Sequence, residues 1–220
     1  MTTRRAILVS ILMIPGAATA MGDTGMELHE AAAANNANRL SGLIASGHDI
    51  EARDKQERTP LLMATRANAL DAARVLIQAG ADVNAKDRIA DTPFLYAGAE
   101  GRLEILKLIL ATGKANLKDT NRYGGNALIP ACHHGHPETV RELLKTEIDV
   151  NHVNRLGWTA LLETIILSDG GPTHQDIMAQ LIAAGADINL ADLDGVTPLA
   201  HARQRNYAEM VEMLEKAGAE

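Results

Sequence analysis

The chain has 220 residues, of which 46% are hydrophobic, 22% charged and only 2% aromatic, and its formal net charge is −7. That hydrophobic content predicts a folded protein, whereas the scarcity of aromatic residues argues against a β-sandwich, whose strands favour them. The negative charge disfavours general nucleic-acid binding, which depends on basic residues that neutralise phosphates.

The first twenty residues predict a secretory signal peptide. Arg4 and Arg5 precede a short apolar run at 6–14, and Pro15-Gly16 would break a helix there. Ala18-Thr19-Ala20 has the small-x-small pattern of a cleavage site. The apolar run is shorter than the ~20 residues that a membrane-spanning helix needs. We therefore expect cleavage after Ala20, a mature protein in the periplasm or secreted, and no stable membrane insertion.

The paired arginines leave the export route open. Adjacent arginines occur in twin-arginine signals and also in ordinary Sec signals, so Arg4 and Arg5 are compatible with both. Removal of residues 1–20 takes away these two of the 21 basic residues, which leaves 19 against 28 acidic residues and a net charge of −9. Because Cys132 is the single cysteine, no internal disulfide is expected.

A period of 33 residues runs through the rest of the chain. The triplet Thr59-Pro60-Leu61 returns at Thr92, more loosely at Asn126, and again at Thr159 and Thr197. A glycine marker keeps step with this triplet, and its members are Gly47, Gly80, Gly113, Gly185 and Gly218. Two markers that recur in register predict an array of structural repeats.

Each repeat is expected to hold two helices. A threonine before proline favours a helix start, because its hydroxyl accepts a bond from a free amide and proline fits the first helical position. The glycine suits a left-handed helix end. Leu103, Leu106 and Leu110 illustrate the apolar spacing of the second helix. One such unit cannot bury its apolar face alone, so neighbouring units must stack.

These residues resemble the ankyrin repeat family over nearly all of 26–220, with the best agreement at 59–87 and 192–219. The resemblance implies an all-α solenoid of about six repeats, capped at both ends, with a helix-turn-helix and a β-hairpin finger loop in each repeat. It also implies a concave face lined by the first helices. The domains are then a signal peptide at 1–20 and an ankyrin-repeat domain at 21–220.

Three departures from the repeat are expected to alter local structure. One extra residue between Gly113 and Asn126 predicts a longer or bulged finger. Five extra residues fall near 168–175, between the two helices of the fifth repeat, and form either a solvent loop or a contact loop. Glu147 replaces the helix-ending glycine, so that helix must end differently or carry about 1 kcal/mol of strain.

The run from Cys132 to His136 is the cluster with metal-ligand residue types. Neighbouring helical residues do not face the same way, and tetrahedral zinc needs four converging ligands, so we assign no metal and no cofactor. A metal- or haem-handling protein is the alternative. Cys132 is expected to pack inside, whereas His133 and His134 are expected to contact a partner, with a pH dependence at about pH 6–7.

We predict no enzyme activity, because the sequence shows no nucleophile motif and no phosphate loop. Most ankyrin proteins bind other proteins, so the resemblance implies a non-catalytic interaction module, expected to be a monomer. Within the family the chain is similar to small exported bacterial members with links to oxidative-stress defence. An accessory protein that supports an exported oxidative-stress enzyme is therefore a further hypothesis.

Positions that vary within the ankyrin family predict the partner-binding surface. In this chain they are Lys55, Gln56, Arg58, Arg66, Lys86, Arg88, Ile89, Asp91, Arg122, Tyr123, His133, His134, Arg155, Leu156, Trp158, Ile166 and Leu167. Basic residues recur at one finger position in four repeats, so we expect a protein partner with an acidic strip. An apolar spot on that partner would meet Tyr123, Leu156 and Trp158. The alternative for Trp158 is packing within the array.

Overall fold

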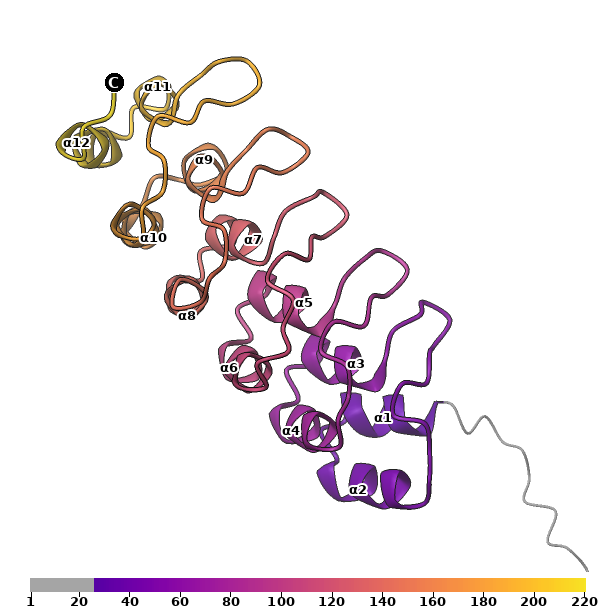
Figure 1. The fold of residues 1–220 in the computed structure, drawn as a ribbon. Coiled ribbons are helices and arrows are strands. Elements are labelled where there is room, and N and C mark those ends of the chain that lie inside the picture. The colour runs from indigo at the N-terminus through magenta and orange to yellow at the C-terminus, as the bar shows by residue number, and fades with distance from the viewer. Residues whose placement is uncertain (1–25) are drawn as a thin grey trace, which may run out of the picture.

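The computed structural model describes residues 26–220, so the predicted signal peptide lies outside the described residues. Within this range twelve helices follow one another in six pairs, one pair per repeat. Figure 1 shows the odd-numbered helices as one row and the even-numbered helices as a second row, with long loops projecting from the side of the first row. We call the odd-numbered helices the inner helices, the even-numbered helices the outer helices, and the projecting loops the fingers.

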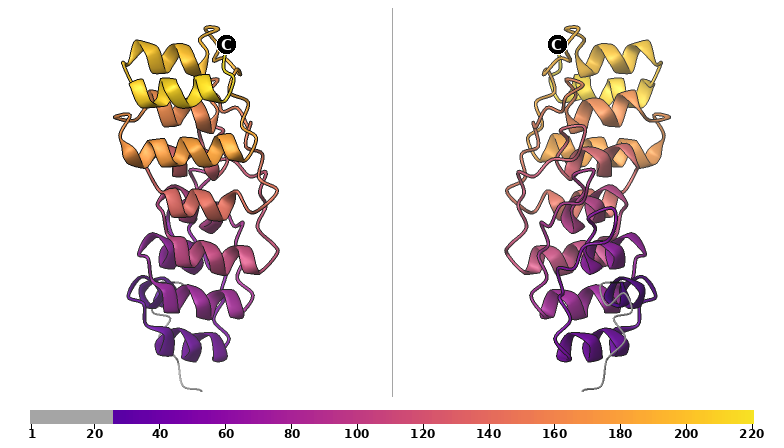
Figure 2. Two further views of the ribbon diagram at one scale, coloured as in Figure 1. Left: turned by 90° about the vertical axis from the view of Figure 1, so that its left-hand side faces the viewer. Right: turned by 90° about the vertical axis from the view of Figure 1, so that its right-hand side faces the viewer.

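The helices of both rows are short. The inner helices are α1 (Glu27–Ala33), α3 (Pro60–Arg66), α5 (Pro93–Ala99), α7 (Leu128–His133), α9 (Ala160–Ile166) and α11 (Pro198–Gln204). The outer helices are α2 (Ala37–Ala45), α4 (Leu70–Gln78), α6 (Leu103–Ala111), α8 (Pro137–Leu143), α10 (Pro172–Ala183) and α12 (Ala208–Lys216). Figure 2 shows them stacked as a ladder, which confirms the predicted all-α solenoid. In the described range no helix has the length and apolar character to cross a bilayer.

The recurring threonine caps an inner helix in each repeat where it occurs. The hydroxyl oxygen of Thr59 accepts a hydrogen bond from the Leu62 amide at 3.2 Å, and Thr92, Thr159 and Thr197 accept equivalent bonds at 3.0–3.3 Å. Asn126 accepts from the amides of two residues in the same way with its side-chain oxygen. The loose fourth copy of the marker therefore keeps the capping function.

The core lies between the two rows of helices. Leu61, Phe94, Leu128 and Leu161, which occupy the same position in successive inner helices, are fully or almost fully buried. The apolar residues of the outer helices, such as Ile105, meet them in one continuous cluster that runs along the array. Burial of each such side chain stabilises the fold by about 1.5–3 kcal/mol. This burial depends on contact with the neighbouring repeat.

The fingers are tight turns, and residues 26–220 contain no β-strand. In the second repeat the Asp54 amide donates to the Arg58 carbonyl at 3.1 Å, and the same closure recurs at 87, 121, 154 and 192. The Asp54 side chain also accepts from two amides of its own finger. The predicted fingers are therefore present, but as hairpin turns held by one aspartate or asparagine each.

The prediction of a longer or bulged fourth finger was wrong. Asn121 closes that finger onto Gly125 with the same spacing as the others. The extra residue lies earlier, between Gly113 and Asn116, where the chain leaves α6. Asn116 accepts from the Lys118 amide at 3.1 Å as Asp82 does from the Asn84 amide, so the register is restored before the finger begins.

The other two departures are absorbed locally. Glu147 is not among the residues with positive φ, and α8 ends differently, because the Thr146 hydroxyl donates to the Leu143 carbonyl and accepts from the Ile148 amide. The segment 168–175 extends the start of α10, which has 12 residues where α4 has 9. It also packs on both neighbouring repeats: the Tyr207 hydroxyl donates to the Ser168 carbonyl at 2.6 Å, and the His174 ring nitrogen lies 3.1 Å from the His133 carbonyl.

Candidate partner-binding groove

The inner helices and fingers of the third to fifth repeats enclose a groove of about 580 Å³. Predicted contact residues that line this groove are Arg66, Ile89, Asp91, Arg122, Tyr123, His133, His134, Leu156 and Leu167. A second hollow of about 520 Å³ lies between neighbouring fingers, and its predicted residues are Lys86, Arg88, Ile89, Arg122 and Arg155. The structure thus brings most of the predicted surface together and leaves Lys55, Gln56, Arg58, Trp158 and Ile166 outside both hollows.

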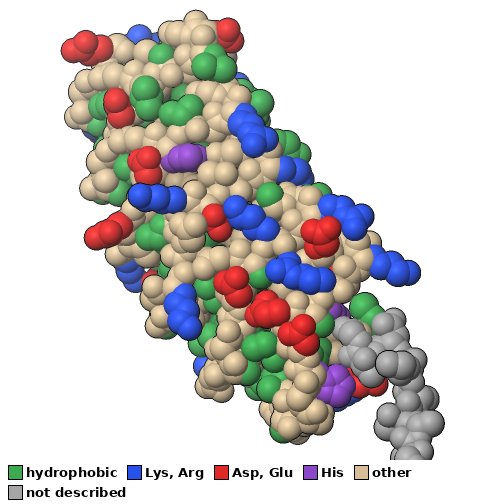
Figure 3. All heavy atoms as spheres, turned by 45° about the vertical axis from the view of Figure 1, so that its right-hand side comes forward, with side chains coloured by type: hydrophobic (Ala, Val, Ile, Leu, Met, Phe, Trp, Pro, Cys, Tyr) green, Lys and Arg blue, Asp and Glu red, His purple; other side chains and the backbone are tan. Residues whose placement is uncertain are grey.

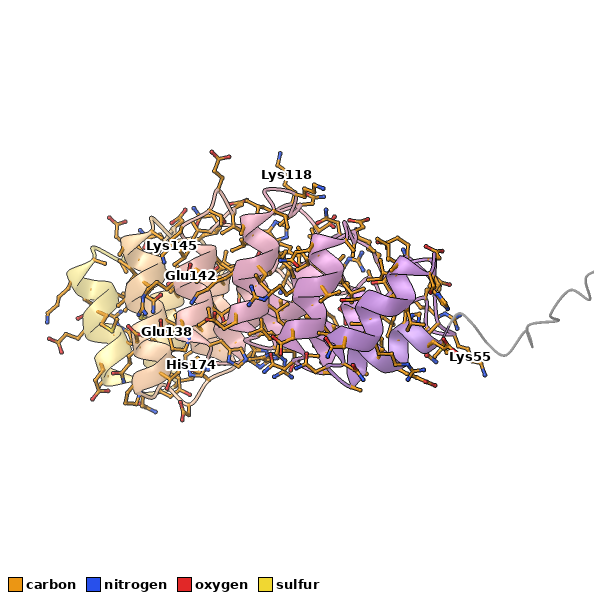
Figure 4. The ribbon with its side chains drawn as sticks, turned by 90° about the horizontal axis from the view of Figure 1, so that it is seen from below. Lys55, Lys118, Glu138, Glu142, Lys145 and His174 are labelled. Atoms are coloured by element: carbon orange, nitrogen blue, oxygen red, sulfur yellow. The ribbon has the colours of Figure 1, made fainter. Side chains whose placement is uncertain are left out.

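Arg58 has an internal role among these outlying residues. Its Nη2 lies 2.6 Å from Asp54 Oδ2, and its Nε donates to the same oxygen at 2.7 Å. Burial tends to raise the pKa of Asp54, but hydrogen bonds from Arg58 and from backbone amides bring it below its ordinary value. Arg58 therefore braces its finger. Lys55 points away from the body of the array (Figure 4), and Trp158 is half-buried.

The backbone amides of the finger arginines link successive fingers, and the arginine side chains place positive charge at the surface. The Arg88 amide donates to the Gln56 carbonyl, and the Arg155 amide donates to the Tyr123 carbonyl. Arg122 lies with its guanidinium carbon 4.6 Å from the centre of the Tyr123 ring. Figure 3 shows Lys and Arg side chains along this face with acidic side chains among them. The charge pattern is therefore mixed, with arginines at the finger rim.

The side chains of the Cys132–His136 run do not converge on one point. Cys132 is fully buried, and burial raises the pKa of its thiol well above the ordinary value. His133 faces Glu163, with 3.8 Å between Nδ1 and Oε2, whereas His134 donates to the Ala99 carbonyl at 2.6 Å. Across residues 26–220 no three His, Cys, Asp or Glu side chains are placed to hold a metal ion. The run therefore does not form a three-ligand metal site in the described structure.

Glu163 is the groove residue that sequence reasoning missed. It lies on α9, is 6% exposed and lines the groove. Burial raises the pKa of Glu163 to about 7, although the Asn154 amide group opposes this shift by donating to Oε1 at 2.8 Å. The equivalent position holds Met63, Tyr96 and Pro130 in three preceding repeats but Glu30 in the first. Alignment of the repeats therefore gives only a weak signal for Glu163.

The sixth repeat contains a related pair at the same two positions. Asp192 in the finger and His201 on α11 lie 2.7 Å apart, from Oδ2 to Nε2. The Val196 amide lowers the pKa of Asp192, burial opposes that effect, and His201 adds to it. Both pairs join a finger to the inner helix nine residues later, but the carboxylate is on the helix in the fifth repeat and on the finger in the sixth.

Comparison with known proteins agrees with this geometry. A family model described as ankyrin repeats (3 copies) matches residues 28–121, 94–192 and 131–220. The ankyrin repeat protein YahD of Escherichia coli strain K12 is 40% identical over 190 residues, which cover 86% of this chain and 94% of that protein.

Two solved structures extend the comparison. An ankyrin repeat domain from Acinetobacter baumannii AYE has a TM-score of 0.86 and 55% identity, covering 89% of this chain and 99% of that one. The ankyrin repeat domain of Bcl-3, a member of the IκB family, has a TM-score of 0.80 and 25% identity, covering 88% of this chain and 86% of that one.

Proposed function

The chain belongs to the ankyrin repeat family, which generally serves protein–protein interaction, and we propose that it binds a protein partner in the bacterial cell envelope through its groove and fingers. The observation that carries the proposal is the groove of the third to fifth repeats, where exposed apolar side chains stand beside finger arginines. Ile89, Tyr123 and Leu156 are 45%, 53% and 50% exposed. Tyrosine and arginine are residue types that contribute much of the energy in protein interfaces.

The partner is proposed to carry an acidic strip and an apolar spot. The strip would follow Arg88, Arg122 and Arg155 along the finger rim, and the spot would meet Tyr123 and Leu156. Charge complementarity of this kind mainly speeds association and selects the partner. The location in the periplasm or outside the cell rests on the residues of the predicted signal peptide alone.

A monomer is the proposed state of the free protein. The outer face of α12 exposes Glu209, Glu212 and Glu215. A polar outer face of this kind is what a terminal repeat needs in order to remain soluble. Size-exclusion chromatography with light scattering would give a mass near that of one chain.

The test is a pull-down from an envelope extract with three baits. They are the wild type, a finger variant with Arg88, Arg122 and Arg155 changed to Glu, and a control variant with Lys107, Lys145 and Lys216 of the outer face changed to Glu. Both variants change the net charge equally. We expect a partner that the wild type and the control retain and that the finger variant loses. Equal retention by all three baits would contradict the proposal.

A further inference from the structure

Glu163 is a buried carboxylate that faces the groove without a strong cation. Its Oε1 accepts from Asn154 at 2.8 Å, and its Oε2 faces only the His133 imidazole at 3.8 Å. Of the side chain, 8% is exposed, on the side of the groove. Over the described range, no lysine or arginine forms an ion pair with Glu163.

Several other shielded carboxylates of the fingers have a cationic or imidazole partner, and buried Asp87 is held by backbone amides instead. Asp54 is paired with Arg58 at 2.6 Å, and Asp91 lies 3.8 Å from Arg66. A carboxylate taken out of water without a cation is costly to the fold. Such a group is therefore a candidate for contact with something that the free protein lacks.

The surroundings of Glu163 leave the carboxylate available. From α7, His133 is the nearest base, and burial together with His134 and His174 lowers its pKa, so it is mainly neutral at pH 7. From α11, His201 is paired with Asp192, and the guanidinium of Arg205 lies against the Ile166 carbonyl at 3.4 Å. His134 on α7 also favours the ionised form of Glu163 electrostatically. The adjoining helices thus supply imidazoles to Glu163 but no lysine or arginine.

The groove is apolar beside Glu163, and its far wall carries charges of both signs. Leu156 and Leu167 line it next to α9 and are 50% and 40% exposed. Asp91 and Glu100 line the wall toward the third repeat together with Arg66 and Arg122, and Arg66 lies 3.8 Å from Asp91. A cationic side chain that reaches Glu163 would therefore meet negative charge at its head and apolar surface along its stem, the environment that long basic side chains favour.

We propose that Glu163 anchors a lysine or arginine side chain of the protein partner, with apolar neighbours of that residue resting on Leu156 and Leu167. The inference rests on the proposed function and specifies its partner: beside an acidic strip for the finger rim, the partner presents a basic residue between apolar ones. The ionised carboxylate accepts the charge-assisted hydrogen bonds. A proton held by Glu163 at neutral pH passes to the buffer when the cation binds.

Two blocked tripeptides provide the probe. N-acetyl-leucyl-arginyl-leucine amide carries the cation, and N-acetyl-leucyl-citrullyl-leucine amide has nearly the same shape without the charge. Each is titrated into the wild type, into Glu163→Gln and into Glu138→Gln, and binding is followed by backbone NMR shifts of α9 and by the carboxyl carbon shift of Glu163. Glu138 provides the control because it lies on the outer helix α8 (Figure 4), with 63% of its side chain exposed.

We expect the wild type and Glu138→Gln to bind the arginine peptide about tenfold more tightly than the citrulline peptide, a preference that corresponds to one charge-assisted contact. Glu163→Gln should bind both peptides equally. Equal binding of the two peptides to the wild type, absence of binding by either, or a preference that survives in Glu163→Gln would overturn the anchor.

The envelope pull-down separates this inference from the proposed function. If a partner is lost by the finger variant while the wild type does not discriminate between the peptides, the interaction module stands and the anchor fails. If the peptides are discriminated through Glu163 while every bait retains the same proteins, the anchor stands and the proposed finger contact with a protein partner fails.

Discussion

In the fifth and sixth repeats, a finger side chain contacts a side chain nine residues later on the inner helix. The carboxylate of this pair lies on the helix in the fifth repeat and on the finger in the sixth. In the sixth repeat, Asp192 accepts from finger amides with one oxygen and from His201 with the other. In the fifth repeat, Asn154 accepts from finger amides with its oxygen and donates to Glu163 with its nitrogen.

The pKa values of the two carboxylates, which are opposite members of equivalent pairs, are therefore shifted in opposite directions. Backbone amides and an imidazole hold Asp192 and lower its pKa, whereas burial beside one neutral amide raises the pKa of Glu163 to about 7. The position of a carboxylate relative to free N–H groups, and not its depth in the array alone, decides whether its ionised form is favoured. The same fold thus favours the ionised carboxylate in the sixth repeat and disfavours it in the fifth.

The largest effect is expected from Asn154→Asp, which turns the fifth pair into two carboxylates. One oxygen of the new side chain would still accept from the finger amides, so the other would face Glu163, and two buried carboxylates in contact cannot both ionise readily. We expect a loss of about 3–5 kcal/mol in the free energy of unfolding at alkaline pH, and less near pH 6, where one proton is shared. Urea unfolding across this pH range measures the difference.

A second change should repair that variant. Adding Glu163→His to Asn154→Asp reproduces the Asp192–His201 arrangement in the fifth repeat, so most of the lost stability should return. If the double variant is no more stable than Asn154→Asp alone, the fifth repeat does not offer the Asp–His pair the same stabilising surroundings as the sixth.

The second effect is a change of pH slope in Glu163→Gln. The folded-state pKa of Glu163 is raised from 4.5 to about 7, so the native state binds more protons than the unfolded state in this interval. Wild-type stability should therefore lose about 3 kcal/mol from this group as pH rises from 4.5 to 7. Glu163→Gln keeps an acceptor for Asn154 and removes the titration, so its curve should stay flatter and exceed the wild type above pH 7. Parallel curves for the two proteins would contradict the assignment.

Much of the fold and part of the groove could be predicted from the repeat. Thr59 and Leu61 have clear local reasons, a cap and a buried position, and each recurs, so the period carries them into every unit. The groove residues Arg122, Tyr123 and His133 could be predicted because the family places its contacts at those positions. The extra residue after Gly113 was misplaced because spacing counts residues without showing which hydrogen bonds they make.

Glu163 was missed for a different reason. The side chains that surround it, Asn154 and His133, come from a finger and from another helix. No local sequence pattern shows that these two residues, and no lysine or arginine, are its neighbours. Alignment of the repeats does not single it out either, because the equivalent position holds Met63 and Tyr96 in two repeats but Glu30 in the first. Both its place in the groove and its charge state require the three-dimensional surroundings.

The smallest effect is expected from Asp192→Asn, the counterpart of the change at Glu163. The lowered pKa of Asp192 means that its ionised form stabilises the fold, a contribution present at neutral pH and lost as pH falls through the folded-state pKa, below 3.8. Asparagine can still accept from the finger amides but not with a charge, so we expect a loss of about 1–2 kcal/mol at pH 7. The loss should shrink in acid, where the wild type is protonated as well. Urea unfolding from pH 7 down through the folded-state pKa of Asp192 tests this, and a deficit of constant size over the whole range would mean that the carboxylate acts by shape and not by charge.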